Sequence, residues 1–188
     1  LSEIIFLDRD RVEVKFLNKM KESSKPSNIE LAICLVKKNP MEIILQKATE
    51  LGVSRITPII SERTEVKELN YERAQKIVIE ATEQSNQLNP PEVTKVIKLK
   101  DFLKKLDSGS KFLFADVNSQ NNLQKKDVDG DTLKTILIGP EGDFSPGERE
   151  SILARANTTS FSISKNILRS DTAVISAISL VNFINNLH

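Results

Sequence analysis

The chain has 188 residues, of which 39% are hydrophobic and 28% are charged, and its formal net charge is +1. This is enough apolar material for a core, and the balanced charge gives no sign of a nucleic-acid partner. No apolar run reaches the ~18 residues that a membrane span needs, and the first twenty residues do not resemble a signal peptide. We therefore expect a cytoplasmic protein with no membrane partner.

The chain begins with two segments in which apolar and polar residues alternate. Residues 3–8 and 11–17 predict an antiparallel hairpin. Because a lone hairpin is not stable and the chain starts at Leu1, we interpret it as the end of a small β-domain whose beginning is missing. The polar segment 20–28, which contains Pro26, is interpreted as a linker.

From residue 29 onward, strands alternate with helices, which is typical of a parallel α/β sheet with helices on both faces. The predicted strands are 29–36, 56–60, 93–97, 112–115, 135–138 and 160–163. The predicted helices are one capped by Asn39 and ended by Gly52, then 71–87, 145–156 and 172–187, with a polar loop at 118–131. Ligand sites in such sheets are expected at the carboxyl ends of the strands.

Cysteine and histidine are scarce, with one residue of each kind. His188 is the last residue, so a His-based triad, a Cys/His dyad or a His-ligated metal site is hard to build. Cys34 lies in an apolar run and is expected to be a buried, inert thiol. Carboxylates could still hold magnesium. An enzyme of this composition would act through positioning and electrostatics, as in group transfer from an activated donor.

The turn after the strand 135–138 carries the strongest local signal. Gly139 and Gly142 leave backbone N–H groups uncovered, and Glu141 places a carboxylate between them. Ser145 is expected to cap the next helix. These residues alone fit either an ordinary strand-to-helix connection or a loop that holds a small polar ligand by its main chain.

The last helix, 172–187, is apolar nearly all round and must be buried on more than one side. It is either a central core helix or a helix shared with a second copy of the chain. Arg169 and Asp171 precede it, and Ser170 or Asp171 can cap it. The two charges form a structural ion pair, or the carboxylate holds the arginine at a site.

Three separated groups of residues resemble the ribosomal small subunit methyltransferase E family. They read KATELGV, RITP and SER at 47–53, 55–58 and 61–63; EQS at 83–85; and IGPEG and ILRSDTA at 138–142 and 167–173. Their order and spacing extend over residues 37–181. The resemblance implies S-adenosylmethionine-dependent methylation of N3 of one uridine in small-subunit (16S) rRNA by a SPOUT-class enzyme.

The resemblance also implies a fold and an assembly. The fold would be α/β, a SPOUT-type sheet with helices on both faces and a C-terminal trefoil knot, preceded by the remnant of a PUA-like β-barrel. Residues 1–25 would belong to the barrel and residues 26–188 to the methyltransferase domain. The partners would be small-subunit rRNA or the ribosomal particle, and a second copy bound through the C-terminal helix.

The resemblance places the methyl donor on three loops and calls for no metal. The loops follow Ala115, span Gly139–Gly142, and run from Ile163 to Leu168. The expected donor-binding residues are Ala115, Ile138, Gly139, Pro140, Glu141, Gly142, Ile163, Ile167, Leu168 and Thr172. The expected catalytic residues are Arg169 and Glu141, and the expected substrate contacts are Lys47, Arg63 and Arg169. Arg169 would stabilise negative charge on the uracil oxygens, and Glu141 or Asp171 would orient it or accept the proton.

The chain departs from the family at several positions. Asp143 replaces a second glycine, Ser164 another glycine, and Asn166 and Gln87 replace arginines. Asp143 would either repel phosphate or point to solvent, and the lost arginines would weaken contacts with RNA. These departures motivate the alternative of a non-catalytic RNA-binding or ribosome-assembly module that keeps the SPOUT fold. A third reading is a phosphate- or nucleotide-binding enzyme with an anion site at the Gly139 turn.

Overall fold

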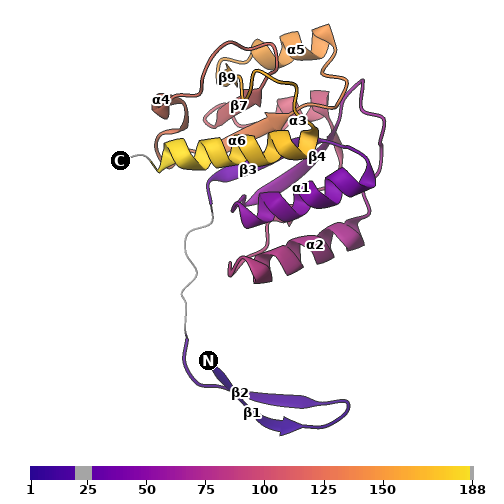
Figure 1. The fold of residues 1–188 in the computed structure, drawn as a ribbon, viewed down its shortest axis with the longest axis vertical. Coiled ribbons are helices and arrows are strands. Elements are labelled where there is room, and N and C mark those ends of the chain that lie inside the picture. Colours follow the sequence, from indigo (N-terminus) through magenta and orange to yellow (C-terminus); the bar gives the residue numbers. More distant parts are fainter. Residues whose placement is uncertain (20–26, 187–188) are drawn as a thin grey trace.

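The computed structural model describes residues 1–19 and 27–186 (Figure 1). Residues 20–26 of the expected linker and the terminal His188 lie outside this part of the chain. The predicted N-terminal hairpin is present: β1 (Ser2–Leu7) pairs antiparallel with β2 (Val12–Phe16) and forms a sheet of its own. Among the described residues, no helix is both long and apolar enough to cross a bilayer.

The remaining strands form one parallel sheet in the order β5-β4-β3-β8-β7-β9, with β6 also paired to β4. The strands are β3 (Ile29–Cys34), β4 (Arg55–Ile60), β5 (Glu92–Val93), β6 (Ile97–Lys98), β7 (Lys111–Ala115), β8 (Lys134–Ile138) and β9 (Thr158–Phe161). The register aligns Ala115 with both Ile138 and Phe161. The carboxyl ends of β7, β8 and β9 therefore meet at one place on the sheet edge.

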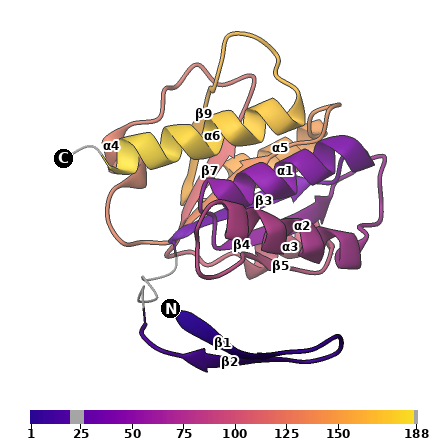
Figure 2. The ribbon, with the colours of Figure 1, turned by 60° about the horizontal axis from the view of Figure 1, so that its bottom comes forward.

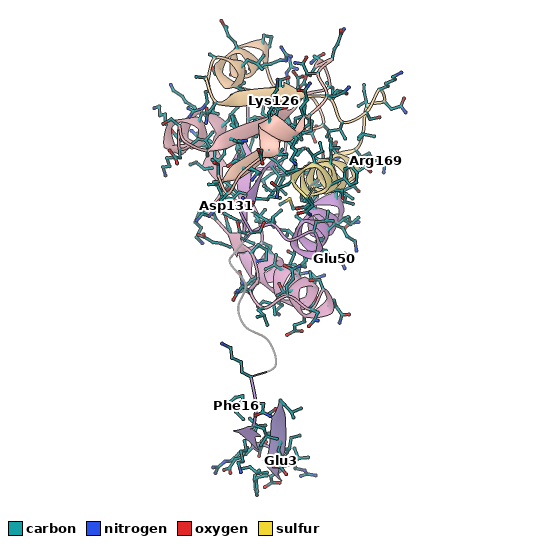
Figure 3. The ribbon with its side chains drawn as sticks, turned by 90° about the vertical axis from the view of Figure 1, so that its left-hand side faces the viewer. Glu3, Phe16, Glu50, Lys126, Asp131 and Arg169 are labelled. Carbon is teal, nitrogen blue, oxygen red and sulfur yellow. The ribbon has the colours of Figure 1, made fainter. Side chains whose placement is uncertain are left out.

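Helices cover both faces of the sheet, as predicted. They are α1 (Lys38–Glu50), α2 (Tyr71–Gln84), α3 (Leu99–Lys105), α4 (Lys125–Val128), α5 (Pro146–Leu153) and α6 (Ser170–Asn185). Leu31 and Ile33 of β3 pack in the core beneath α1, α2, α4 and α6, whereas Ala32 and Cys34 face the core beneath α3 and α5. Figure 3 shows α1, α2 and α6 on one side of the sheet and α3 and α5 on the other.

The last helix, α6, lies beside α1 (Figure 2). Its inner side chains Val174, Ala177, Ile178, Val181 and Ile184 are buried in the larger core. Near its end, the side-chain amide of Asn182 donates a hydrogen bond of 2.9 Å to the carbonyl of Leu51. The side chain of Phe183 remains 65% exposed, so α6 buries most, but not all, of its apolar surface.

Several predicted helix boundaries were wrong. Helix α1 begins at Lys38 without a side-chain cap, so Asn39 is not its cap. Helix α2 ends at Gln84, and Asn86 adopts a positive φ of 55°. This turn lets the Gln87 side chain donate hydrogen bonds to the last carbonyls of α1.

Other differences concern short elements and the start of α6. The predicted strand 93–97 is two short strands, β5 and β6, and β9 begins at Thr158 rather than at residue 160. Helices α3 and α4 were not predicted, although Leu99, Phe102 and Leu103 give α3 a buried face. At α6, Arg169 occupies the N-cap position without a side-chain hydrogen bond, so neither Ser170 nor Asp171 caps it.

Cys34 is fully buried, as predicted, and its chemistry follows from that burial. Burial raises the pKa of its thiol from 9.0 to about 12, although hydrogen bonds with Ser61 and Thr64 oppose the shift. We expect no reaction with Ellman's reagent at pH 8 until urea unfolds the chain. Because the folded state holds the proton more tightly, the thiol should lower the free energy of unfolding as the pH rises from about 9 to about 12. Rapid labelling of the folded protein would contradict this.

Candidate functional site

A cleft of ≈ 170 Å³ lies at the carboxyl ends of β7 and β8, beside the segment that joins β9 to α6. Of the expected donor-binding residues, those that line it are Ala115, Ile138, Gly139, Pro140, Glu141, Ile163, Ile167 and Leu168. Gly142 and Thr172 do not line it. The remaining lining residues include Asp116, Asp143, Asn166, Ser170 and Ala173. The structure thus brings the three expected loops together around one cavity.

The turn after β8 is shaped by close contact between Gly139 and Phe144. A Cβ atom at Gly139 would lie 3.0 Å from Cε2 of Phe144, a ring that is only 3% exposed. That ring packs edge-on against Phe114, with 5.6 Å between the ring centroids. Glycine at 139 therefore lets the backbone pass directly over a buried aromatic ring. A Cβ at Gly142 would meet the Arg63 side chain at an ordinary 3.8 Å.

The Asp143 side chain is half-buried and lines the cleft, so it does not simply point to solvent, whereas repulsion of a phosphate stays a prediction. Its backbone has a positive φ of 58°, a conformation that glycine adopts readily and aspartate tolerates. One carboxylate oxygen accepts a 2.7 Å hydrogen bond from the Phe144 amide, and the other accepts a 3.3 Å bond from the Asn118 side chain. The carboxylate therefore ties the β7 loop to the β8 loop.

Ser145 caps α5 as predicted, in a reciprocal arrangement with Glu148. The Ser145 hydroxyl accepts from the Glu148 amide at 3.3 Å, and the Glu148 carboxylate accepts from the Ser145 amide at 3.1 Å. The second Glu148 oxygen accepts from the Glu62 amide at 2.8 Å. The N-terminus of α5 already holds a negative charge, which disfavours an anion site there.

Asp116 anchors the β7 loop and was not predicted as a site residue. Its side chain is fully buried, and its carboxylate accepts hydrogen bonds from the Asn118 amide at 2.9 Å and the Ser160 hydroxyl at 3.1 Å. It also forms an ion pair with Arg149 of α5. The only sequence signal was an aspartate directly after a buried strand.

We expect Asp116→Asn to lower the free energy of unfolding by about 1–3 kcal/mol, because Arg149 would lose the buried charge that it faces. Urea unfolding followed by circular dichroism would measure this. Asp101→Asn removes an exposed carboxylate on α3 and should change stability by less than about 0.5 kcal/mol. Equal effects of the two substitutions would contradict an anchoring role for Asp116.

The segment between β9 and α6 presents both apolar surface and free backbone donors. The Ile167 side chain is 88% exposed although it lines the cleft. Within the described part of the chain, the amides of Ile167 and Leu168 donate to no protein acceptor. A hydrogen bond of 2.8 Å from the Ser162 amide to the Asn121 carbonyl holds the segment against the β7 loop.

The candidate charged residues separate into two groups. Arg63 lies beside the cleft and donates a 3.0 Å hydrogen bond to the Gly142 carbonyl. Arg169 is exposed at the start of α6, next to the lining residues Leu168 and Ser170 (Figure 3). The expected pair with Asp171 is not formed; the Asp171 carboxylate accepts from the Thr172 amide at 2.8 Å.

Lys47 lies away from these residues. It pairs with Glu50 at 2.8 Å in the last turn of α1, which reaches the amino edge of the sheet because α1 returns from the carboxyl end of β3. Two further surface arginines are also engaged: Arg55 pairs with Glu30 and Glu92, and Arg73 pairs with Glu42. Of the cations considered, only Arg63 and Arg169 adjoin the cleft.

Glu141 lines the cleft and is exposed, and its side chain makes no hydrogen bond or ion pair within the residues described. A carboxylate with no protein partner beside a cleft is available to a ligand or to a neighbouring cation. In the same part of the chain, no group of three or more His, Cys, Asp or Glu residues could hold a metal ion. The site therefore offers apolar surface, backbone donors, two adjoining arginines and the Glu141 carboxylate, which, unlike those of Asp116 and Asp143, has no partner within the residues described.

Comparison with known proteins gives the family. The RNA methyltransferase domain matches residues 22–182. Ribosomal RNA small subunit methyltransferase E of Rickettsia conorii is 32% identical over an alignment of 195 positions, which covers 99% of this chain and 77% of the relative. Its counterpart in Aquifex aeolicus is also 32% identical, over 94% of this chain and 78% of the relative. The Neisseria gonorrhoeae enzyme of that name, solved bound to S-adenosyl methionine, is 30% identical with a TM-score of 0.87, over 98% of this chain and 78% of its own. The chain therefore belongs to the ribosomal RNA small subunit methyltransferase E family of RNA methyltransferases.

Proposed function

We propose that this protein transfers a methyl group from S-adenosylmethionine to N3 of a specific uridine in small-subunit (16S) rRNA. The observation that carries the proposal is the cleft in which the loops after β7, β8 and β9 meet. The Neisseria gonorrhoeae relative, whose fold covers nearly the whole of this chain, was solved with S-adenosyl methionine bound. We therefore place the methyl donor of this chain in the cleft.

The residues of the cleft suit the two halves of that donor. Ile138, Ile163 and Ile167 offer apolar surface to adenine, and the exposed Ile167 would be covered by it. The unpaired amides of Ile167 and Leu168 can donate hydrogen bonds to ring nitrogens. When bound, S-adenosylmethionine supplies an already activated methyl group, so the protein needs no metal to make it reactive.

Arg169 and Glu141 have the properties that methylation of an imide nitrogen requires. Uridine N3 must lose its proton, and the negative charge then spreads onto the two neighbouring carbonyl oxygens. The guanidinium of Arg169, free of Asp171, can stabilise that charge. Glu141 is the better proton acceptor of the two carboxylates considered, because the Asp171 oxygen is engaged by the Thr172 amide.

The proposed contacts with rRNA centre on Arg63 and Arg169, which adjoin the cleft. We do not propose Lys47 as an rRNA contact at the cleft of its own chain, since its ammonium pairs with Glu50 at the opposite edge of the sheet. Asn166 lines the cleft without the charge of an arginine. Gln87 has a structural role, because it caps the carbonyls at the end of α1.

The finer features of the fold are part of the same proposal. A C-terminal trefoil knot is supported by α6, which contacts both β8 and the helix α4 that lies in the connection leading to β8. A homodimer through the C-terminal helix is supported by the exposed ring of Phe183. We place the protein in the cytoplasm, where ribosomal particles are found.

We also propose that residues 1–25 belong to a PUA-like β-barrel and residues 26–188 to the methyltransferase domain. The hairpin leaves apolar side chains exposed along both strands, including Ile4, Phe6, Val14 and Phe16. A sheet of this kind needs further strands to cover it. The change from antiparallel to parallel pairing after β2 also supports a boundary there.

The proposal is tested with small-subunit particles from a strain that lacks this enzyme. The purified protein and S-adenosylmethionine should produce one 3-methyluridine in the rRNA, detected by mass spectrometry of nuclease fragments. Calorimetric titration with S-adenosylmethionine separates the alternatives. A protein that binds the particle but not the donor would be a non-catalytic assembly module, and methylation at another base would overturn the uridine assignment.

A further inference from the structure

A second concavity lies between α3 and α5, on the face of the sheet opposite to α1, α2 and α6. It measures ≈ 660 Å³, and its charged lining residues are Lys98, Lys100, Lys104, Arg155, Glu62 and Glu148. We call it the lysine groove. It shares no residue with the cleft at β7 and β8. Most of its lining residues are polar or charged, and Ile60, Leu99 and Leu103 add apolar surface.

The lysine groove holds four cationic side chains against two carboxylates, Glu62 and Glu148, so positive charge is in excess. Lys98, Lys100 and Lys104 are all exposed, and none makes a hydrogen bond or ion pair within the described residues. The segment 95–105 holds five lysines and a single aspartate, Asp101, which does not line the groove. This density of one charge stands out in a chain whose net charge is only +1.

Three other charged residues line the groove: Glu148 and Arg155 bind backbone groups, and the exposed Glu62 carboxylate makes no hydrogen bond or ion pair within the described residues. The two oxygens of Glu148 accept from the amides of Glu62 and Ser145. The Arg155 guanidinium donates to the carbonyls of Leu103 and Leu106, at the end of α3. The three lysines are the cations left to bind an incoming anion, and they outnumber the one unpaired carboxylate, Glu62.

The spacing of two of these lysines makes an anionic partner more favourable. Lys100 and Lys104 are four residues apart on α3, so they lie on the same side of the helix. Like charges at this spacing repel each other and destabilise a helix. An anion bound between them would remove the repulsion, and successive phosphates of a nucleic acid can engage both.

The lysine groove and the donor cleft open toward the same edge of the sheet. Lys98 ends β6 and Ser61 follows β4, as Gly139 follows β8. The loop after β4 also touches the β8 turn: Arg63 donates to the Gly142 carbonyl at 3.0 Å, and the Glu62 amide donates to Glu148. Arg63 therefore stands between the two concavities and extends the positive surface from one toward the other.

We propose that the lysine groove binds the sugar-phosphate backbone of the rRNA at nucleotides that flank the methylated base. This inference rests on the proposed function. Lysines contact phosphates as point charges and carry no base specificity. The groove would hold the RNA in place while the nucleotide at the donor cleft is selected by other contacts.

The test uses the triple variant Lys98→Gln, Lys100→Gln, Lys104→Gln and purified small-subunit rRNA. The matched control is Lys76→Gln, Lys125→Gln, Lys126→Gln, which removes three exposed lysines from α2 and α4. Affinity is measured by filter binding from 50 to 300 mM KCl. We expect the groove variant to bind roughly 10- to 100-fold more weakly and to lower the salt slope by about 2–3, as the loss of three phosphate contacts requires. The control should match the unmodified protein.

Binding of S-adenosylmethionine, measured by calorimetry, shows that the groove variant is folded and should be unchanged. An rRNA affinity and salt slope equal to those of the unmodified protein would overturn the groove assignment and leave the proposed function standing. Equally tight, lysine-dependent binding of polyglutamate would show a general site for acidic chains and overturn the RNA assignment. Lysine-dependent rRNA binding by a protein that binds no donor would support the groove and overturn the proposed function.

Discussion

Replacing Arg169 by alanine is expected to lower methylation of small-subunit rRNA by about 10²–10³-fold and to leave the affinity for S-adenosylmethionine within about threefold. The side chain is exposed at the start of α6, beside Leu168 and Ser170 of the cleft. It forms no ion pair with Asp171 that its loss would break. The charge on the uracil oxygens develops only as the proton leaves, so the loss should appear in kcat more than in KM.

Three measurements make this prediction specific. Single-turnover methylation with radiolabelled donor gives the rate, calorimetry gives donor affinity, and filter binding gives rRNA affinity. Arg169→Lys should recover part of the rate because it keeps the charge and loses the planar fork. Lys76→Ala removes an exposed cation from α2 and should react at the normal rate. Full activity of Arg169→Ala would remove it from the chemistry, and a loss confined to rRNA affinity would make it a binding residue only.

The part of the fold that could be predicted from sequence is the part fixed by neighbouring residues. The strand at 135–138 is a continuous apolar run, and β8 occupies Lys134–Ile138. Ser145 and Glu148 satisfy each other's backbone groups three residues apart, and α5 begins where this capping box predicts. Parallel pairing followed from the alternation of strands and helices, and the sheet is parallel throughout residues 29–161.

What could not be predicted depends on contacts between distant residues. The end of α2 is set by Gln87, which turns back to the carbonyls of Thr49 and Glu50 thirty-seven or more positions earlier. The anchoring role of Asp116 depends on Ser160 and Arg149, which are distant in sequence and lie beside it only in the folded chain. No local pattern marks a side chain whose partners come from three different elements.

The same distinction applies to the candidate site. The three loops were predicted by resemblance, and the register of β7, β8 and β9 explains why they meet. Sequence position could not show which cations would face the cleft. Arg63 and Lys47 belong to the same group of matching residues. The loop after β4 brings Arg63 to the Gly142 carbonyl beside the cleft, whereas Lys47 lies in the last turn of α1, at the opposite edge of the sheet, where it pairs with Glu50 of the same helix.

Gly139 gives the second large expected effect. Gly139→Ala should weaken S-adenosylmethionine binding by at least about tenfold and lower the free energy of unfolding by about 1–3 kcal/mol. The new Cβ would lie 3.0 Å from Cε2 and 3.3 Å from Cδ2 of Phe144. Because that ring is buried edge-on against Phe114, the backbone of the turn must move instead, and the turn lines the cleft.

Gly109→Ala is the matched control, since its Cβ would meet only the Asp107 side chain at 3.6 Å, and it should bind the donor normally. A rescue variant identifies the cause. Phe144→Leu removes the ring atoms that the new methyl group meets, so the double variant Gly139→Ala, Phe144→Leu should bind the donor more tightly than Gly139→Ala alone. Additive losses in this double-mutant cycle would show that the Phe144 contact is not what constrains the turn. Unchanged donor affinity in Gly139→Ala would mean that the turn only connects β8 to α5.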